Sequence, residues 1–274
     1  MAEGASPDSE AEVLVDGFAK CTACLAAAVN GHAEVVTLLV EHRADLKRGE
    51  VGGRERTPLH AVVASDDPLS MANDGLVKLL ISLRAEVDAE DGDGRTALHA
   101  ALEANNAEMV ELLLDLNADV TAKDNSGMNS IHIAAKYGAT RAMERMSDIK
   151  GPQISYGAPN LLHMDWTPLH YAAEFGHIDV VQLIVGSGAV ESGEVDVNAK
   201  DSDGATPLHI ALAADRGEPC RAFYETLRDK GANVDAMDHD GETPRQLFRK
   251  FQHEAESQDQ GEVEGESEVR GRLA

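Results

Sequence analysis

Histidine is the residue type in this chain with the clearest capacity for chemistry. The sequence holds 11 histidines, and imidazole nitrogen is a common zinc ligand. Five of them end a recurring tetrad that reads T-P-L-H or a close variant. These tetrads end at His60, His99, His132, His170 and His209. Whether these histidines can share a metal therefore depends on how far apart the tetrads lie in the fold.

A pair of cysteines forms a second motif. Cys21 and Cys24 match C-x-x-C, the spacing of redox dithiols and of half a zinc site, but no second pair follows. Cys24 takes the tetrad position that Leu holds elsewhere, so we expect it to be buried and Cys21 to be the more accessible thiol. Because reactivity needs an exposed thiolate of low pKa, we interpret the pair as structural.

Acidic pairs before glycine suggest calcium, a third possible chemistry. The matching positions in a calcium loop would need an oxygen ligand two residues before the first Asp and a Glu at the twelfth place. Here alanine, isoleucine or leucine stands there, so tight turns explain the pattern better. The pairs are Asp91 with Asp93, Asp201 with Asp203, and Asp238 with Asp240.

Motifs of common enzyme classes do not occur in the sequence. There is no G-x-S-x-G, P-loop or kinase signature. We therefore expect no catalytic residues, no metal, no cofactor and no enzymatic activity.

Composition narrows the class of partner and the compartment. The net charge of -25 disfavours nucleic acid and anionic membranes and favours a protein partner with a basic surface. Three cysteines indicate a reducing compartment. The chain shows neither a membrane-length apolar run nor a signal peptide, so we expect a cytoplasmic or nuclear monomer.

The elements that position these residues follow from the repeat. The tetrads beginning at Thr57, Thr96, Asn129, Thr167 and Thr206, with weaker copies at Thr22 and Thr243, start 33 to 39 residues apart. The fifth copy, TPLHYAAEFGHIDVVQLIV, resembles the ankyrin-repeat family, whose signature is T-P-L-H-x-A-A-x-x-G-H. Thr can cap a helix, and Pro suits its first turn.

This resemblance implies an all-α solenoid of stacked helix-turn-helix units with hairpin-like tips, covering residues 17–253. It also implies that the tetrad histidines lie in separate units, too far apart to share zinc, and that they hydrogen-bond the turn that joins neighbouring units. The seventh copy is polar and reads as a terminal cap. Residues 1–16 and 254–274 are acidic tails, and low apolar content predicts disorder at 1–11 and 254–274.

Irregular positions interrupt the repeats. Insertions occur at residues 65–74, 147–159 and 186–194. Each insertion either carries a function or is extra surface loop that the fold tolerates. The turn after each second helix favours a residue with positive φ, which Gly231 and Asn117 provide. Arg43 and Arg84 fit this position poorly.

The resemblance implies a function in binding. The family uses its concave surface to recognise proteins, so we expect a scaffold or adaptor, with a regulatory subunit or inhibitor of an enzyme as the alternative. Aromatic and Met residues gather at the fourth and fifth units, on an otherwise acidic face. Alternatively, Trp166 and Leu162 pack beneath the preceding insertion. The predicted partner-binding residues are Arg95, Met128, Lys136, Tyr137, His163, Met164, Trp166, Glu174 and Phe175.

Overall fold

The structure is a computed structural model that describes residues 10–11, 21–50, 54–64, 71–148, 155–213, 218–250 and 252. The chain divides into two compact units, residues 1–154 and 155–274, which are described separately. In the described part, no helix combines the length and the apolar character needed to cross a bilayer. The predicted tail at 254–274 and residues 65–70 and 149–154 of two insertions lie outside the described residues.

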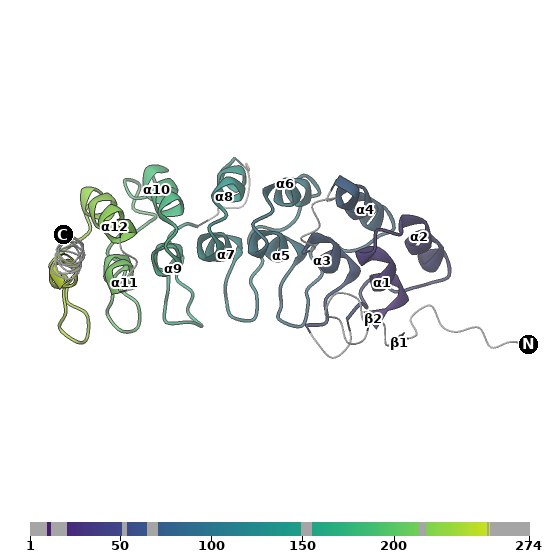
Figure 1. Cartoon of the computed structure of the whole chain (residues 1–274), viewed down its shortest axis with the longest axis horizontal. Helices are drawn as coiled ribbons and strands as arrows, with labels where there is room; N and C mark the ends of the chain where they lie inside the picture. Colours follow the sequence, from purple (N-terminus) through teal and green to yellow (C-terminus); the bar gives the residue numbers. More distant parts are fainter. Residues whose placement is uncertain are drawn as a thin grey trace, which may run out of the picture. The chain divides into compact units, whose positions relative to one another are not determined.

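Unit 1 is a stack of four helix pairs (Figure 1). The first helix of each pair packs on its own second helix, and α1, α3 and α5 also pack on the first helix of the next pair. The first helices form one row, and their connecting tips project from it. The pairs are α1 (Ala23–Val29) with α2 (Ala33–Glu41), α3 (Pro58–Val63) with α4 (Met71–Ser82), α5 (Ala97–Glu103) with α6 (Ala107–Asp115), and α7 (Ser130–Tyr137) with α8 (Thr140–Ser147).

Unit 2 repeats the arrangement with two full pairs and a terminal helix. Residues 244–250 are helical, and Phe248 in this helix stacks on Tyr224 of the preceding repeat with ring centroids 4.1 Å apart. The polar seventh copy therefore does cover the last full repeat. The pairs are α9 (Pro168–Phe175) with α10 (Ile178–Gly186), and α11 (Pro207–Ala213) with α12 (Glu218–Asp229). The predicted all-α stack of helix-turn-helix units is confirmed.

The tetrads explain where the first helices begin. In the four tetrads that begin with Thr, the His Nδ1 accepts the backbone N–H of the Thr, at 3.0 to 3.4 Å. This bond fixes the neutral tautomer that carries its proton on Nε2. In the Asn129 tetrad, His132 Nδ1 lies 2.6 Å from Asn129 Oδ1 and donates to it, because an amide oxygen only accepts. His60 Nε2 then donates to the Arg95 carbonyl at 2.8 Å, and His209 Nε2 donates to the Glu242 carbonyl at 3.3 Å.

The histidine bonds connect each repeat to the next. His99 and His170 make the same kind of bond, to the carbonyls of Ala122 and Ala205. Burial lowers the pKa of His60 and His99, and lowers that of His170 to about 4, which keeps the rings neutral. The predicted role in joining units is thus confirmed for these four histidines.

The tips are closed by their aspartates. Asp91 N–H donates to the Arg95 carbonyl at 2.8 Å, while Asp91 Oδ1 accepts the backbone N–H groups of Asp93 and Arg95 at 2.9 Å. Gly94 supplies the positive φ of +73° that this turn needs. Asp201 makes the equivalent bonds in unit 2. The carboxylates therefore serve the turn, as the sequence predicts.

Neighbouring tips also pair along the stack. Asn125 N–H donates to the Asp93 carbonyl in unit 1 at 2.9 Å, and His239 N–H donates to the Asp203 carbonyl in unit 2 at 2.9 Å. A Cβ on Gly94 would lie 2.6 Å from Asn125 Oδ1. The glycine is thus required by the close approach of tips as well as by its φ.

The N-terminal part differs from expectation in two places, at Cys21 and at Glu10–Ala11, the latter pair having been predicted to be disordered. Cys21 is fully buried, because it pairs with Glu50 in a β-bridge and packs on Leu25 of α1. The prediction that Cys21 is an accessible thiol is therefore wrong, and burial raises its pKa. Two residues of the predicted tail, Glu10–Ala11 (β1), pair antiparallel with Cys21–Thr22 (β2).

Candidate functional site

One position of the repeat carries side chains of very different kinds. It is the residue immediately before each tetrad, here named the pre-tetrad position, and its carbonyl accepts the histidine bond in three repeat junctions. Its backbone is fixed by this bond, so its side chain is free to vary. From the second to the seventh repeat the position holds Arg56, Arg95, Met128, Trp166, Ala205 and Glu242.

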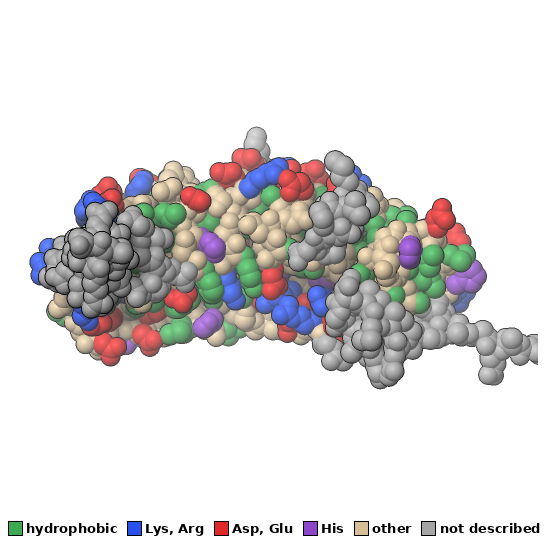
Figure 2. Space-filling view, viewed as in Figure 1, with side chains coloured by type: hydrophobic (Ala, Val, Ile, Leu, Met, Phe, Trp, Pro, Cys, Tyr) green, Lys and Arg blue, Asp and Glu red, His purple; other side chains and the backbone are tan. Residues whose placement is uncertain are grey.

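In unit 1 the two pre-tetrad arginines line a cavity of about 400 Å³ between the second and third repeats. Figure 2 shows Lys and Arg side chains gathered beside Asp and Glu in the part of unit 1 that holds α5. We name this cavity the arginine pocket. It is lined by Arg54, Arg56, His60, Ala64, Asp91, Arg95, Ala100, Glu103 and Ala104.

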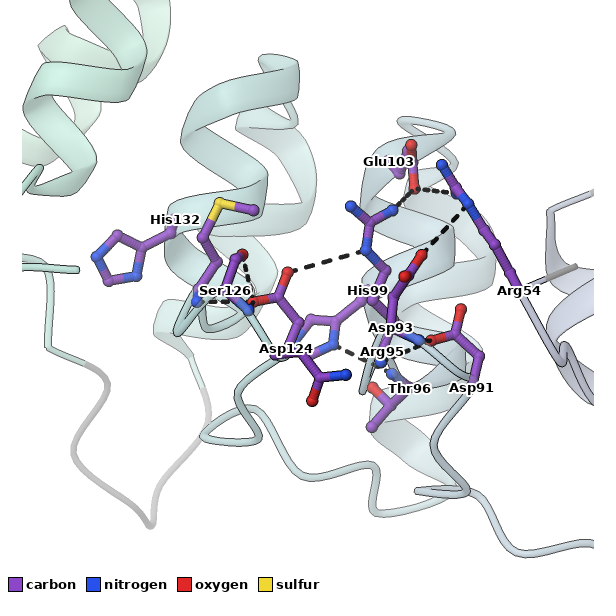
Figure 3. A network of polar contacts seen from close by, with 12 residues as sticks. Arg54, Asp91, Asp93, Arg95, Thr96, His99, Glu103, Asp124, Ser126 and His132 are labelled. Carbon is purple, nitrogen blue, oxygen red and sulfur yellow. Dashed lines mark hydrogen bonds and ion pairs between the residues drawn. The ribbon is translucent and has the colours of Figure 1, made fainter. Parts of the chain in front are cut away.

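Glu103 is the hub of the polar network beside this pocket (Figure 3). Its Oε2 accepts a hydrogen bond from Arg95 Nη1 at 2.6 Å and lies 3.8 Å from Arg54 Nη1. Its Oε1 accepts the Tyr137 hydroxyl proton at 3.0 Å. Burial and the Glu103 carboxylate together raise the pKa of Tyr137. Arg54 Nε also lies 3.4 Å from Asp93 Oδ2.

Arg95 is well positioned but incompletely bonded. Its side chain is 16% exposed, and its Nε lies 3.8 Å from the buried Asp124 Oδ2 of the next tip, which exceeds hydrogen-bond length. Arg95 Nε has no hydrogen-bond partner in the described part of the structure. The guanidinium is thus held between two carboxylates, by a short bond to Glu103 and a longer ion pair to Asp124.

In unit 2 the fifth repeat has an enlarged tip. Asn160 N–H donates to the Trp166 carbonyl at 2.8 Å, so six positions separate the closing residues, whereas four separate Asp201 and Ala205. The extra length exposes Leu161 and Leu162, whose residues are 75% and 72% accessible. We name residues 160–166 the long tip.

Strain accompanies the long tip. Met164 and Asp165 have φ of +54° and +57°, a region that costs a non-glycine residue about 1 kcal/mol or more. Asp165 occupies the tip position that glycine holds in other repeats, such as Gly204 in the sixth repeat. The tip keeps this conformation because Ser202 N–H of the next repeat donates to the Met164 carbonyl at 3.0 Å.

Trp166 forms the base of the long tip. Its ring stacks on His163 with centroids 5.7 Å apart and an interplanar angle of 11°, and meets Tyr171 edge to face at 5.2 Å. Its Nε1 donates to Asp201 Oδ2 at 3.1 Å. The ring is half-buried, whereas Leu162 points into solvent, so the alternative in which Leu162 packs beneath the insertion does not match the structure.

The predicted binding residues divide between the two units. Arg95, Lys136 and Tyr137 are half-buried in unit 1, with Lys136 Nζ 5.5 Å from the centre of the Tyr137 ring. Met128 is buried and offers no surface to a partner. The residues of unit 2 are His163, Met164 and Phe175, which are exposed, and Trp166 and Glu174, which are half-buried.

Sequence reasoning missed three features of these surfaces. Arg54, Glu103 and the pair Leu161–Leu162 were not among the predicted residues. A signal existed for Glu103, because it takes the same place in its repeat as Lys136 and Glu174. The long tip could have been found by counting residues from the tip Asn to the tetrad, which gives two more than in the third, fourth, sixth and seventh repeats.

Comparison with known proteins finds the same repeat architecture elsewhere. A family model described as ankyrin repeats in three copies matches residues 69–156 and 153–238, and a single ankyrin repeat matches 20–48. Among solved structures, the ankyrin repeat domain of Bcl-3 superposes with a TM-score of 0.61 over 82% of this chain and 93% of that chain. Its sequence identity of 24% shows the shared fold alone.

Curated relatives match over shorter stretches. The Neurogenic locus Notch protein of Drosophila melanogaster is 40% identical over 78 residues, which is 28% of this chain and 3% of that protein. Protein phosphatase 1 regulatory subunit 12A of Mus musculus is 41% identical over 63 residues, 23% of this chain and 6% of that protein. The chain thus matches only a small part of the length of these relatives.

Proposed function

Since the chain belongs to the ankyrin-repeat family, we propose that it is a protein-binding scaffold or adaptor that recognises its partner through tips and first helices. The proposed function is binding without catalysis. The tetrad histidines, the residues best suited to acid–base chemistry, use both ring nitrogens to hold the repeats together, as His60 and His170 illustrate.

The observation that carries this proposal is the long tip of unit 2. Leu161 and Leu162 are each more than 70% exposed, and Met164 beside them and Phe175 at the end of α9 are also exposed. Contiguous apolar side chains on a soluble surface mark interaction sites. Trp166 beneath them gives the tip a rigid base, which lowers the entropy lost when a partner binds.

The chemistry of the partner follows from charge. A net charge of -25 favours a protein with a basic surface, since complementary potentials speed encounter and reject like-charged proteins. Nucleic acid and anionic membranes are disfavoured on the same ground. We further propose that the chain acts as a monomer in the cytoplasm or nucleus.

A regulatory subunit or inhibitor of an enzyme is the second candidate. It is favoured by the similarity to a stretch of a protein named as a regulatory subunit of protein phosphatase 1. In both cases the surface used is the same, and only the nature of the bound protein differs. Recovery of one stoichiometric enzyme would indicate the regulator, and recovery of several unrelated proteins would indicate the adaptor.

Partner capture with tip variants tests the proposal. The full chain is immobilised as wild type, as the double variant Leu161→Ser/Leu162→Ser, and as Leu38→Ser, which alters a leucine that is 55% exposed on α2 of unit 1. Proteins bound by wild type and Leu38→Ser should be lost from the double variant. Equal retention by all three would show that the long tip is not the binding site.

A further inference from the structure

The second helix of the first repeat exposes apolar side chains. Val35 and Leu38 on α2 are 46% and 55% exposed. This helix aligns without gaps with the second helices of the next two repeats, because VVTLLVEHRA (35–44), LVKLLISLRA (76–85) and MVELLLDLNA (109–118) share one apolar spacing. Burial at equivalent positions can therefore be compared directly along unit 1.

The later repeats of unit 1 bury the position of Val35. Its equivalents are 3% exposed or less, and they are Leu76, Met109 and Ala142. Of the equivalents of Leu38 in the second and third repeats, Leu79 is half-buried and Leu112 is buried. The exposure of Val35 and Leu38 is thus a property of the first repeat and not of the residue types.

The first helix shows the same contrast at its first residue. Ala23 of α1 is exposed, whereas the residues at its place in the next three repeats are buried, namely Pro58, Ala97 and Ser130. We name Ala23, Val35 and Leu38 the first-repeat face. This face has the character of the surfaces that the fold elsewhere places between repeats.

Helices lie against the equivalent face in other repeats. α8, which carries Ala142, packs on α6 of the preceding repeat, and in unit 2 α12 packs on α10 in the same way. α12 carries Phe223 at the place of Val35, and Phe223 is 1% exposed. Figure 1 shows α4 on one side of α2 and no described helix on the other. The shape that fits the first-repeat face is therefore a helix.

The charge of α2 indicates what kind of helix fits. Glu34 and Glu41 are the charged residues of α2, and both are exposed. They are seven positions apart and so lie on the same side of the helix. Neither forms an ion pair within the residues that the structure describes, and Arg43 follows only in the turn beyond α2. An apolar stripe bordered by free carboxylates complements an apolar stripe bordered by Lys or Arg.

From these observations we propose that the first-repeat face docks an amphipathic α-helix of a partner protein. The apolar side of that helix covers Ala23, Val35 and Leu38, and its Lys or Arg side chains lie beside Glu34 and Glu41. Docking of an amphipathic helix through its apolar face is a common mode of peptide recognition. The proposal rests on the binding function proposed above, and it gives the adaptor a second contact surface, in unit 1.

Charge disfavours two other occupants of the face. Symmetric pairing of two copies through α2 would bring four carboxylates together, those of Glu34 and Glu41 from each copy, and like charges in contact oppose association. Residues 12–20 of the chain, which lie outside the described residues, carry Glu12 and Asp16 against Lys20. Their net charge therefore also matches the two glutamates poorly.

Methyl nuclear magnetic resonance tests the proposal with defined probes. The full chain, labelled with ¹³C at leucine and valine methyl groups, is titrated at physiological salt with a stapled, alanine-rich helical peptide whose leucines form one stripe bordered by lysines. We expect saturable shifts at Val35 and Leu38. The matched peptide with glutamate in place of each lysine should bind about tenfold more weakly or not at all.

Variants separate the face from the general acidity of the chain. Leu38→Ser should abolish the shift at Val35. Glu34→Lys should weaken binding of the lysine peptide by about tenfold and strengthen binding of the glutamate peptide. Asp179→Lys is the matched control, because Asp179 is exposed and holds the place of Glu34 in the fifth repeat, and it should leave the titration unchanged. Circular dichroism of each variant checks that the helices are retained.

Three results would overturn the proposal. The first is the absence of saturable shifts at Val35 and Leu38, and the second is equal binding of the two peptides. The third is self-association of the free chain in sedimentation that Leu38→Ser removes, because it would assign the face to a second copy.

The two proposals fail separately. The peptide titration reports on unit 1, whereas the capture experiment depends on Leu161 and Leu162 in unit 2. If the peptide does not shift Val35 and Leu38 while the tip variant loses captured proteins, the helix-docking face is wrong and the binding function stands. If capture is unaffected by the tip variant while the peptide binds, the long tip is wrong and the first-repeat face stands.

Discussion

The Tyr137 hydroxyl donates a hydrogen bond to Glu103 Oε1 over 3.0 Å, between residues 34 positions apart. It joins the last residue of α7 to the last residue of α5. In a stacked-repeat protein such contacts between neighbours supply much of the stability, since each repeat touches only the next. The same carboxylate fixes Arg95, so this pair also supports the arginine pocket.

Tyr137→Phe should therefore weaken unit 1. The change removes one hydrogen bond to a charged acceptor and keeps the ring, so we expect the free energy of unfolding to fall by about 1 to 2 kcal/mol. Urea denaturation measures this. Tyr224→Phe is the control, because Tyr224 packs by ring stacking on Phe248, and it should change stability by less than about 0.5 kcal/mol. Equal effects would contradict a role for the Glu103 bond.

Two arginines after second helices are predicted to cost stability. Arg43 and Arg84 both have a φ of +72° and are exposed, as their repeat position predicts. Replacing either by Gly removes this strain, although glycine also adds entropy to the unfolded chain. The net effect should be a rise in the free energy of unfolding of about 0.5 to 1 kcal/mol. Thermal denaturation with calorimetry measures it.

Asn117 provides the internal comparison for this test. It occupies the same turn with a φ of +64°, and asparagine tolerates that region better than other residues with side chains. Asn117→Gly should therefore gain less than Arg43→Gly or Arg84→Gly. A loss of stability in both arginine variants would show that their side chains make a compensating contact.

Stability should depend on pH through His170. Its pKa is lowered to about 4, chiefly by burial, whereas an unfolded histidine titrates near 6.5. Between these values the unfolded chain binds a proton that the folded chain does not. The stabilising contribution is complete above pH of about 6.5 and is lost as pH falls, by about 3 kcal/mol near pH 4.

A glutamine variant isolates this effect from the many titrating acids. Gln246 already takes the place of the tetrad histidine in the seventh copy, where its Oε1 accepts the Thr243 N–H at 2.9 Å. His170→Gln should thus keep the helix start and remove the titration. The difference in unfolding free energy between wild type and variant, measured from pH 7 to 4, should shrink toward acid. A constant difference would contradict a lowered pKa.

The net charge of -25 predicts that the rate of association with the partner depends on salt. If the partner is basic, raising the ionic strength should slow association, because exposed charges act mainly on the encounter rate, with much less effect on dissociation. Surface plasmon resonance at low and high salt measures both rates for a partner recovered by capture. An association rate that does not change with salt would rule out the basic partner.

The sequence was sufficient to predict the fold but only part of the surfaces. Thr57 and Thr167 mark where α3 and α9 begin, because capping and proline chemistry are local properties of a few adjacent residues. The Arg95–Glu103 bond depends on how one tip sits over its own helix, which no single tetrad encodes. Likewise, Cys21 is buried by a bridge to the distant Glu50, so its exposure could not be predicted from its residue type and its neighbours in the sequence.

The role of Trp166 can be resolved by two substitutions at one position. Its ring packs on His163 and Tyr171, and its Nε1 bonds Asp201, so Trp166→Ala should lower the stability of unit 2 by about 2 to 4 kcal/mol. Trp166→Phe keeps an aromatic ring and loses the bond, so it should lower stability by about 1 kcal/mol. Urea denaturation followed by circular dichroism measures both.

Binding must then be compared at equal fold integrity. Trp166 was predicted to contact the partner because it stands beside Met164 and Phe175, where aromatic and Met residues gather. If it does, Trp166→Phe should weaken binding by about tenfold or more under conditions where the variant is fully folded, since tryptophan at an interface often contributes about 2 kcal/mol. If Trp166 only supports the long tip, Trp166→Phe should bind as wild type does, while Leu161→Ser/Leu162→Ser loses the partner. Affinity measured by calorimetry on these variants distinguishes a contact residue from a base on which Leu161 and Leu162 are presented.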